Sequence, residues 1–285
     1  MSAPIVVGTV DVMIDDLKLA NPSAPELRDT KIVLRANASD RAVAVEQFES
    51  LVSGGKIVLS GGLSFPTGAQ GPQLDLAATA REALVARDAD YNVRADADLK
   101  LIGPWVGASL TGEIALTNSR FMKEIDILPV DFPTRSERSN LPEIERRPPA
   151  VKAPPNLDFG IGAAPYKDWT VDVRLVTKDA FLVRGNLARA AAESDLRVTG
   201  TGANPVPDGQ IYLTDGRLTL PFSKVDIGEG RVDFSENTGF NGKLNVQASA
   251  TVRTWNISIY LYGDVLDPEY VLTSEPPLPN EDIIA

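Results

Sequence analysis

The 285-residue sequence contains no cysteine and no histidine. Without Cys the chain forms no disulfide, no thiolate nucleophile and no thiolate metal site. Without His it lacks the most common general base and the most common ligand of transition metals. Catalysis by carboxylates remains possible in principle, but we expect a protein that is not an enzyme and that carries no cofactor.

Further features that the sequence lacks exclude other classes of protein. Aromatic residues make up only 6% of the chain, and no run of 18 or more apolar residues occurs, so we expect no transmembrane helix. The start, MSAPIVVGTVDVMIDD, has no basic region followed by an apolar one and is not a signal peptide. The net charge of −11 disfavours binding to nucleic acid and adsorption to an anionic lipid surface.

Alternation of apolar and polar residues with a period of two runs through most of the sequence. The segment KLNVQASATVRTWNISIYLYG is the clearest example, and GKIVLSGGLSF, GEIALTNSRF and GQIYLTDGRLTL follow the same pattern. This period is typical of strands with one buried face. The pairs DG and NG between the segments favour turns. The pattern predicts an all-β fold, and the only helix candidate inside the chain is ATAREALVARDA.

The sequence also matches itself when it is shifted by 97 residues. Asp98, Leu99 and Gly112 fall on Asp195, Leu196 and Gly209, and further matches are Gly103 with Gly200, Thr117 with Thr214, Arg87 with Arg184, and Arg120 with Arg217. Such a match predicts one supersecondary unit that is stacked on a second copy. The helix candidate overlies the β-rich segment VTKDAFLVRGN, so we expect it to be a strand. Chance alternation in an all-β protein is the alternative explanation.

A segment rich in proline and charge separates the two copies, from Asp126 to Asp168. It has no hydrophobic period, and proline is excluded from interior strands. We expect a poorly ordered linker or loop. Elsewhere, the acids Asp226, Glu229 and Asp233 alternate with apolar residues, which indicates the polar face of strands rather than a calcium site or a glycosidase pair.

The last third of the chain resembles a known family. The segment DGQIYLTDGRLTLPFSKVDIGEGRVDFSEN, followed by GDVLDPEYVLTSEPPLPNEDIIA, is similar to the TamB C-terminal domain of diderm bacteria. The resemblance covers the chain from about Trp169, and residues 1–125 are similar to the looser AsmA-like repeats of that family. It implies AsmA/TamB-like β repeats in 1–125, a linker in 126–168 and a truncated C-terminal β domain in 169–285. Because the family continues where this chain stops, the resemblance also implies a fragment.

The resemblance implies a function as well. The family is expected to form the periplasmic part of a cell-envelope protein that is anchored in the inner membrane and reaches an Omp85-type outer-membrane barrel of the TamA or BamA kind. Its sheet is expected to curl into a U, called a β-taco, whose apolar trough conducts phospholipids. The family is also linked to outer-membrane protein assembly and secretion.

We predict that the apolar stripe of the C-terminal strands lines such a groove and contacts acyl chains. The predicted lining residues are Ile211, Leu213, Leu218, Leu220, Val232, Phe234, Leu244, Val246, Val252, Trp255, Ile257, Ile259 and Leu261. The sparse aromatics leave width between facing walls. Two alternatives remain at this point: a filled β-sandwich that binds nothing, and a scaffold that offers strand edges to outer-membrane barrels without carrying lipid.

Overall fold

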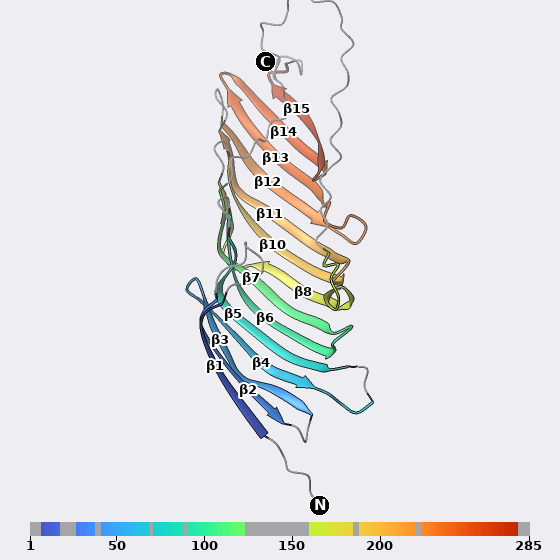
Figure 1. Cartoon of the computed structure of the whole chain (residues 1–285). Coiled ribbons are helices and arrows are strands. Elements are labelled where there is room, and N and C mark those ends of the chain that lie inside the picture. Colours follow the sequence, from blue (N-terminus) through green and yellow to red (C-terminus); the bar gives the residue numbers. More distant parts are fainter. Residues whose placement is uncertain are drawn as a thin grey trace, which may run out of the picture.

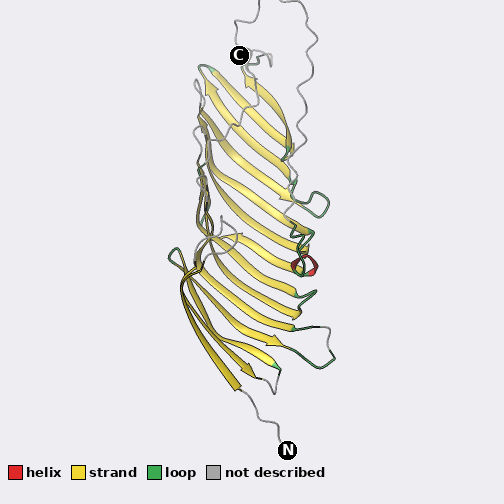
Figure 2. Cartoon of the chain, in the orientation of Figure 1, coloured by secondary structure: helices red, strands yellow, loops and turns green. Residues whose placement is uncertain are grey.

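The fold is defined by a computed structural model that describes residues 7–17, 27–37, 41–68, 71–87, 91–122, 160–184, 188–219 and 224–278. Within these ranges the chain is almost entirely strand, as Figure 2 shows. The only helix among them is η2 (Tyr166–Asp168), a single 3-10 turn. The all-β prediction is therefore confirmed.

All fifteen described strands belong to one sheet, which rises from β1 to β15 in sequence order (Figure 1). Strand β9 lies off this order because it pairs with β7 and β10. The strands are β1 (Val7–Leu17), β2 (Leu27–Asn37), β3 (Ala42–Val52), β4 (Gly55–Ser64), β5 (Gln73–Arg87), β6 (Tyr91–Pro104), β7 (Ser109–Phe121), β8 (Thr170–Thr177), β9 (Phe181–Arg184), β10 (Ala188–Thr201), β11 (Pro205–Thr219), β12 (Lys224–Phe234), β13 (Lys243–Val252), β14 (Trp255–Asp264) and β15 (Asp267–Glu275).

Strand β5 settles the question of the helix candidate. The segment ATAREALVARDA lies largely in β5, which pairs with β4 on one side and with β6 on the other. Its alanines favour a helix by local propensity. Pairing on both sides outweighs that preference, as the repeat had led us to expect.

The 97-residue repeat is present in three dimensions. Gly112 pairs with Leu99 between β7 and β6, and Gly209 pairs with Leu196 between β11 and β10, in the same register. The breaks in register also coincide, after Asn92 in one copy and after Arg189 in the other. Strands β5, β6 and β7 thus form one copy, and the other copy consists of β8 with β9, β10 and β11.

The two copies meet at the one parallel contact of the described sheet. Strands β8 and β9 run parallel to β7, whereas every other described pair of neighbouring strands is antiparallel. A parallel pair requires a connection that returns the chain along the length of the strands. The segment between Phe121 and Thr170 makes this return.

Part of the expected linker, 126–168, is ordered, which corrects that expectation for its last nine residues. The Ile161 N–H donates to the carbonyl of Gly202, and the Ala203 N–H donates to that of Lys167. The indole N–H of Trp169, just after the segment, donates to the Trp105 carbonyl at 2.9 Å. Residues 160–168 therefore cover the turns at one end of the strands. The rest of the expected linker, like the end of the chain from residue 279, lies outside the described residues.

The sheet bends where the strands carry irregularities, and Figure 1 shows the strands curving at one side of the molecule. Glu82 in β5, Asn118 in β7 and Asp215 in β11 have positive φ, and the ladder of each strand changes register there. Bulges of this kind bend strands and increase their twist. Several deeply buried side chains lie beside these bulges: Ala83, Leu84, Ala95, Thr117 and Ser119. Part of the closely packed core of the sheet therefore lies along the bend.

Candidate apolar groove

The most regular alternation of exposure lies in β14. Trp255, Ile257, Ile259 and Leu261 are half-buried, whereas the polar or aromatic residues between them are exposed. Half-burial is informative because a filled β-sandwich core would bury such residues almost completely. The apolar side of β14 is therefore neither free surface nor sealed core.

Pairing extends this apolar face across neighbouring strands. In one row Ile211 of β11 pairs with Val232 of β12, which pairs with Leu244 of β13. In another row Ile259 of β14 lies between Ala248 of β13 and Leu272 of β15. Directly paired residues share a face of the sheet. The predicted stripe is thus one apolar face, shared by β11 to β15.

The structure places most of the predicted lining residues on this face with a similar degree of burial. Ten are half-buried: Ile211, Leu213, Val232, Phe234, Leu244, Val252, Trp255, Ile257, Ile259 and Leu261. Val246 is more deeply buried, at 8% exposure. Leu218 pairs with Val225, but its side chain is not among those described, and Leu220 lies outside the described residues.

The apolar face also continues beyond the residues named from the sequence. Leu76 of β5 pairs with Leu101 of β6, which pairs with Leu110 of β7, and Leu110 lies beside Val171 of β8 across the parallel contact. The alternation in QLDLAATA and DLKLIG is the signal that identifies these residues. Our site prediction stopped short because it used only the C-terminal strands.

The opposite face of the sheet carries charge in cross-strand pairs. Arg174 of β8 donates two hydrogen bonds of 3.0 Å to the carboxylate of Asp195 in β10, and this contact lowers the pKa of Asp195. Similar pairs join Arg197 to Asp172, Arg81 to Asp98, Lys243 to Asp264, and Arg217 to Asp226. Exposed pairs of this kind contribute little to stability. They identify the solvated face.

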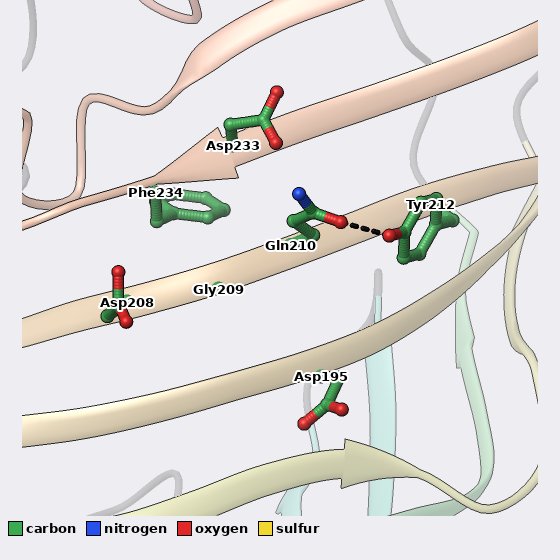
Figure 3. A pocket seen from close by; sticks show the side chains of 7 residues that line it. All are labelled: Asp195, Asp208, Gly209, Gln210, Tyr212, Asp233 and Phe234. Atoms are coloured by element: carbon green, nitrogen blue, oxygen red, sulfur yellow. Dashed lines mark hydrogen bonds between the residues drawn. The ribbon is translucent and has the colours of Figure 1, made fainter.

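A shallow hollow on the second copy contains the acids Asp195, Asp208 and Asp233 (Figure 3). The Tyr212 hydroxyl donates a hydrogen bond to Oε1 of Gln210 there. Asp195 is paired with Arg174 and Asp233 with Arg231, so these two carboxylates already have cationic partners. Among the residues that the structure describes, no group of three or more acidic side chains is placed to hold a metal ion.

The three acids named in the sequence analysis, Asp226, Glu229 and Asp233, also lie on the charged face of the sheet. Asp226 accepts a hydrogen bond from Arg217 at 2.7 Å, and Asp233 accepts one from Arg231 at 2.9 Å. Glu229 is exposed in the same strand. All three acids lie on the polar face, as the alternation predicts, and Asp226 and Asp233 form ion pairs.

One long curled sheet of repeated units, apolar on one face and ion-paired on the other, defines a class of extended β-repeat scaffold. In the described part of the chain, no helix is long and apolar enough to cross a membrane. Residues 46–285 match the family model of the TamB C-terminal domain, and the chain belongs to this family. A search of curated proteins found no match.

The match begins at Glu46 in β3. This is far upstream of Trp169, where the resemblance to the C-terminal domain was expected to begin. Both copies of the repeat therefore lie inside the family domain. The family consists of cell-envelope proteins that are involved in outer-membrane assembly and lipid transport, and it is a family of transport and assembly modules rather than of enzymes.

Proposed function

We propose that this chain is the periplasmic part of an inner-membrane-anchored envelope protein and carries phospholipids between the inner and outer membranes. The acyl chains lie against the apolar face of the sheet. An Omp85-type barrel, of the TamA or BamA kind, receives the protein at the outer membrane, where it also supports protein assembly and secretion. The division into 1–125, 126–168 and 169–285 stays a prediction.

The observation that carries this proposal is the half-burial of Trp255, Ile257, Ile259 and Leu261. Within the part of the chain that the structure describes, their side chains form an apolar surface that is not completely buried. Burying a methylene group contributes about 0.8 kcal/mol. A chain of about fourteen methylenes would therefore gain on the order of 11 kcal/mol against such a surface. No charge falls on the stripe from Leu244 to Val252 or from Trp255 to Leu261, where it would be costly.

Site-specific photocrosslinking in cells tests the proposal. A photoreactive residue at Ile257 or Ile259 is expected to label phospholipid, because both side chains lie on the apolar face. The matched controls are Asn256 and Ser258, which are exposed on the opposite face of the same strand. Labelling confined to the odd-numbered positions supports the groove. Labelling at none of the four positions, or equal labelling on both faces of the strand, contradicts it.

A second function, a strand-edge scaffold for outer-membrane barrels, is favoured by one observation. Strand β15 ends the sheet order, and its only described partner is β14. An open edge is a template for the strand of another chain. Crosslinking from β15 to a barrel, with no lipid labelling at Ile257 or Ile259, would favour this function over lipid transport.

A further inference from the structure

A row of arginines crosses the sheet on its exposed face, close to the ends of the strands. Arg87 ends β5, Arg120 is next to last in β7, and Arg184 ends β9. Arg189 and Arg217 continue the row on β10 and β11. All five are exposed, in a chain whose net charge is −11.

Strand pairing places these arginines side by side. Arg184 pairs directly with Arg189, and Arg189 pairs with Arg217. In the first copy Asn92 of β6 stands between Arg87 and Arg120, paired with both. Neighbouring strands lie about 4.8 Å apart. In the second copy the row therefore brings like charges directly opposite each other, an arrangement that destabilises a sheet.

Most arginines of the row lack the carboxylate partners that several other cations on the same face have. Outside the row, seven basic side chains of the described strands meet a carboxylate, as Arg174 meets Asp195. Of the row, only Arg217 does so, with Asp226 at 2.7 Å. Within the described ranges, Arg87, Arg120, Arg184 and Arg189 form no ion pair or hydrogen bond through their side chains.

The row belongs to the repeated unit. Arg87 and Arg184 are 97 residues apart, and so are Arg120 and Arg217. Each pair occupies the same place in its copy, beyond the register break that bends the sheet. The cations therefore recur at the repeat spacing and follow the long axis of the sheet, across the strands.

We propose that this arginine row binds the headgroup phosphates of phospholipids whose acyl chains lie on the apolar face. This inference rests on the proposed function and names the part of the lipid that the protein recognises. A planar guanidinium binds phosphate through two parallel hydrogen bonds, which suits Arg better than Lys. Bound phosphates would also relieve the repulsion between the opposed arginines.

The position of the row fits this role. At the strand ends the two faces of the sheet meet, so a lipid can hold its acyl chains on the apolar face and its headgroup at the margin. Successive arginines at strand spacing give the phosphate a series of similar sites along the sheet. The overall charge of −11 disfavours adsorption of the whole protein to an anionic membrane. The row is therefore expected to bind individual headgroups at the margin of the groove, not a membrane surface.

The test compares two fluorescent lipids with identical acyl chains, phosphatidylglycerol and diacylglycerol, bound to the purified chain. We expect the wild type to bind phosphatidylglycerol more tightly. The variant Arg184→Gln/Arg189→Gln is expected to bind phosphatidylglycerol about tenfold more weakly and diacylglycerol unchanged. The matched control Lys100→Gln/Lys167→Gln removes the same charge from exposed residues outside the row and is expected to keep the preference.

The other outcomes overturn either the headgroup site or the proposed transport function. Equal binding of both lipids by the wild type, or a preference that survives in the arginine variant, overturns the headgroup site and leaves the groove standing. If the lysine control also loses the preference for phosphatidylglycerol, that preference comes from the overall charge of the protein. This result likewise overturns the site. Displacement of the lipid by equimolar inorganic phosphate identifies a free-anion site instead. If neither lipid binds, the proposed transport function itself fails.

A folding measurement separates headgroup binding from a structural role. Because Arg189 faces Arg184 and Arg217, removing its charge relieves repulsion. The arginine variant is therefore expected to melt at the same temperature as the wild type or at a higher one. A marked fall in its melting temperature would show that the row serves the fold, and would overturn the proposal.

Discussion

Gly112 and Gly209 lie 97 residues apart and occupy the same position in two copies of one unit. Each is a mid-strand glycine with positive φ, +137° and +125° respectively. Each lies against an aspartate carbonyl of the neighbouring strand, that of Asp98 in one copy and that of Asp195 in the other. The repeat therefore preserves a backbone conformation as well as a pattern of side chains, and it does so where only glycine fits.

The variant Gly209→Ala is expected to be destabilised by about 1–3 kcal/mol, which is the usual cost of a non-glycine residue in a strained backbone region. A Cβ there would also lie 2.3 Å from the Asp195 carbonyl oxygen, so the strands would have to move apart. The measurement is chemical denaturation followed by circular dichroism. As a control, Gly228→Ala in β12 places its Cβ 3.8 Å from the nearest atom and is expected to be near neutral. Equal effects of the two substitutions would show that the close approach at Gly209 has no energetic consequence.

Much of this fold was predictable because the period of two survives in almost every strand. Alternation identified the β content, and the repeat correctly converted ATAREALVARDA from a helix candidate into part of β5. The parallel contact of β7 with β8 was not predictable, because pairing direction depends on the path of the connecting segment rather than on strand composition. The order of residues 160–168 escaped prediction for a related reason. It depends on hydrogen bonds to turns more than 30 residues further along the chain, such as that of Gly202.

The sequence predicted which residues share the apolar face of the sheet, but not how deeply that face is buried. Alternation identifies which residues share a side of a strand, as Ile257 and Ile259 do, but it does not fix how deeply that side is buried. Burial depends on the curvature of the whole sheet, and the curvature follows from bulges at residues such as Glu82 and Asn118. The arginine row was not predictable either, but for a different reason: its members are scattered in sequence and become neighbours only through strand pairing.

Acid sensitivity is expected to centre on Asp96. Its carboxylate accepts a hydrogen bond from the Glu82 N–H at 2.7 Å and another from Lys178 at 3.0 Å, and these contacts lower its pKa. The side chain is only 15% exposed. A carboxyl whose pKa is lowered by folding stabilises the protein above its unfolded-state pKa, and that stabilisation is lost as the pH falls through the folded-state pKa.

The variant Asp96→Asn is therefore expected to melt lower than the wild type at pH 7 and to show a smaller fall in melting temperature as the pH is lowered from 5 to about 3. Thermal unfolding at a series of pH values is the measurement. Asp75→Asn, at an exposed carboxylate without an ion pair in the described part of the chain, is the control and should follow the wild-type profile. If Asp96→Asn keeps the full wild-type slope, the acid sensitivity lies elsewhere.

Strand β1 is expected to cause self-association. In the described sheet its only partner is β2, so one side of its backbone is unpaired there. Such an edge pairs with other chains, and charged side chains on it prevent this. Lys in place of Val10 or Val12 is therefore expected to reduce association that rises with concentration, measured by sedimentation velocity. The control Ile102→Lys adds the same charge to β6, which is paired on both sides, and should leave association unchanged. A wild type that stays monomeric at high concentration would mean that the β1 edge is already protected.

A pair of aspartate substitutions distinguishes a groove from a sealed core. Val246 of β13 is 8% exposed, whereas Ile259 of β14 is half-buried on the same apolar face. Val246→Asp places an unpaired charge in a dry site and is expected to cost on the order of 3–5 kcal/mol, which is enough to unfold much of the domain. Ile259→Asp leaves its carboxylate within reach of water or of lipid headgroups, so the protein is expected to stay folded.

Chemical denaturation of both variants, together with lipid photocrosslinking in cells, gives the decisive comparison. The Ile259→Asp variant should keep most of its stability yet lose lipid labelling from a photoreactive residue at Ile257, because a charge on the groove wall repels acyl chains. Ser258→Asp, on the exposed face of the same strand, carries the same charge and should change neither property. If Ile259→Asp instead unfolds as completely as Val246→Asp and the wild type labels no lipid, the apolar face is the interior of a filled sheet. Transport along it is then excluded.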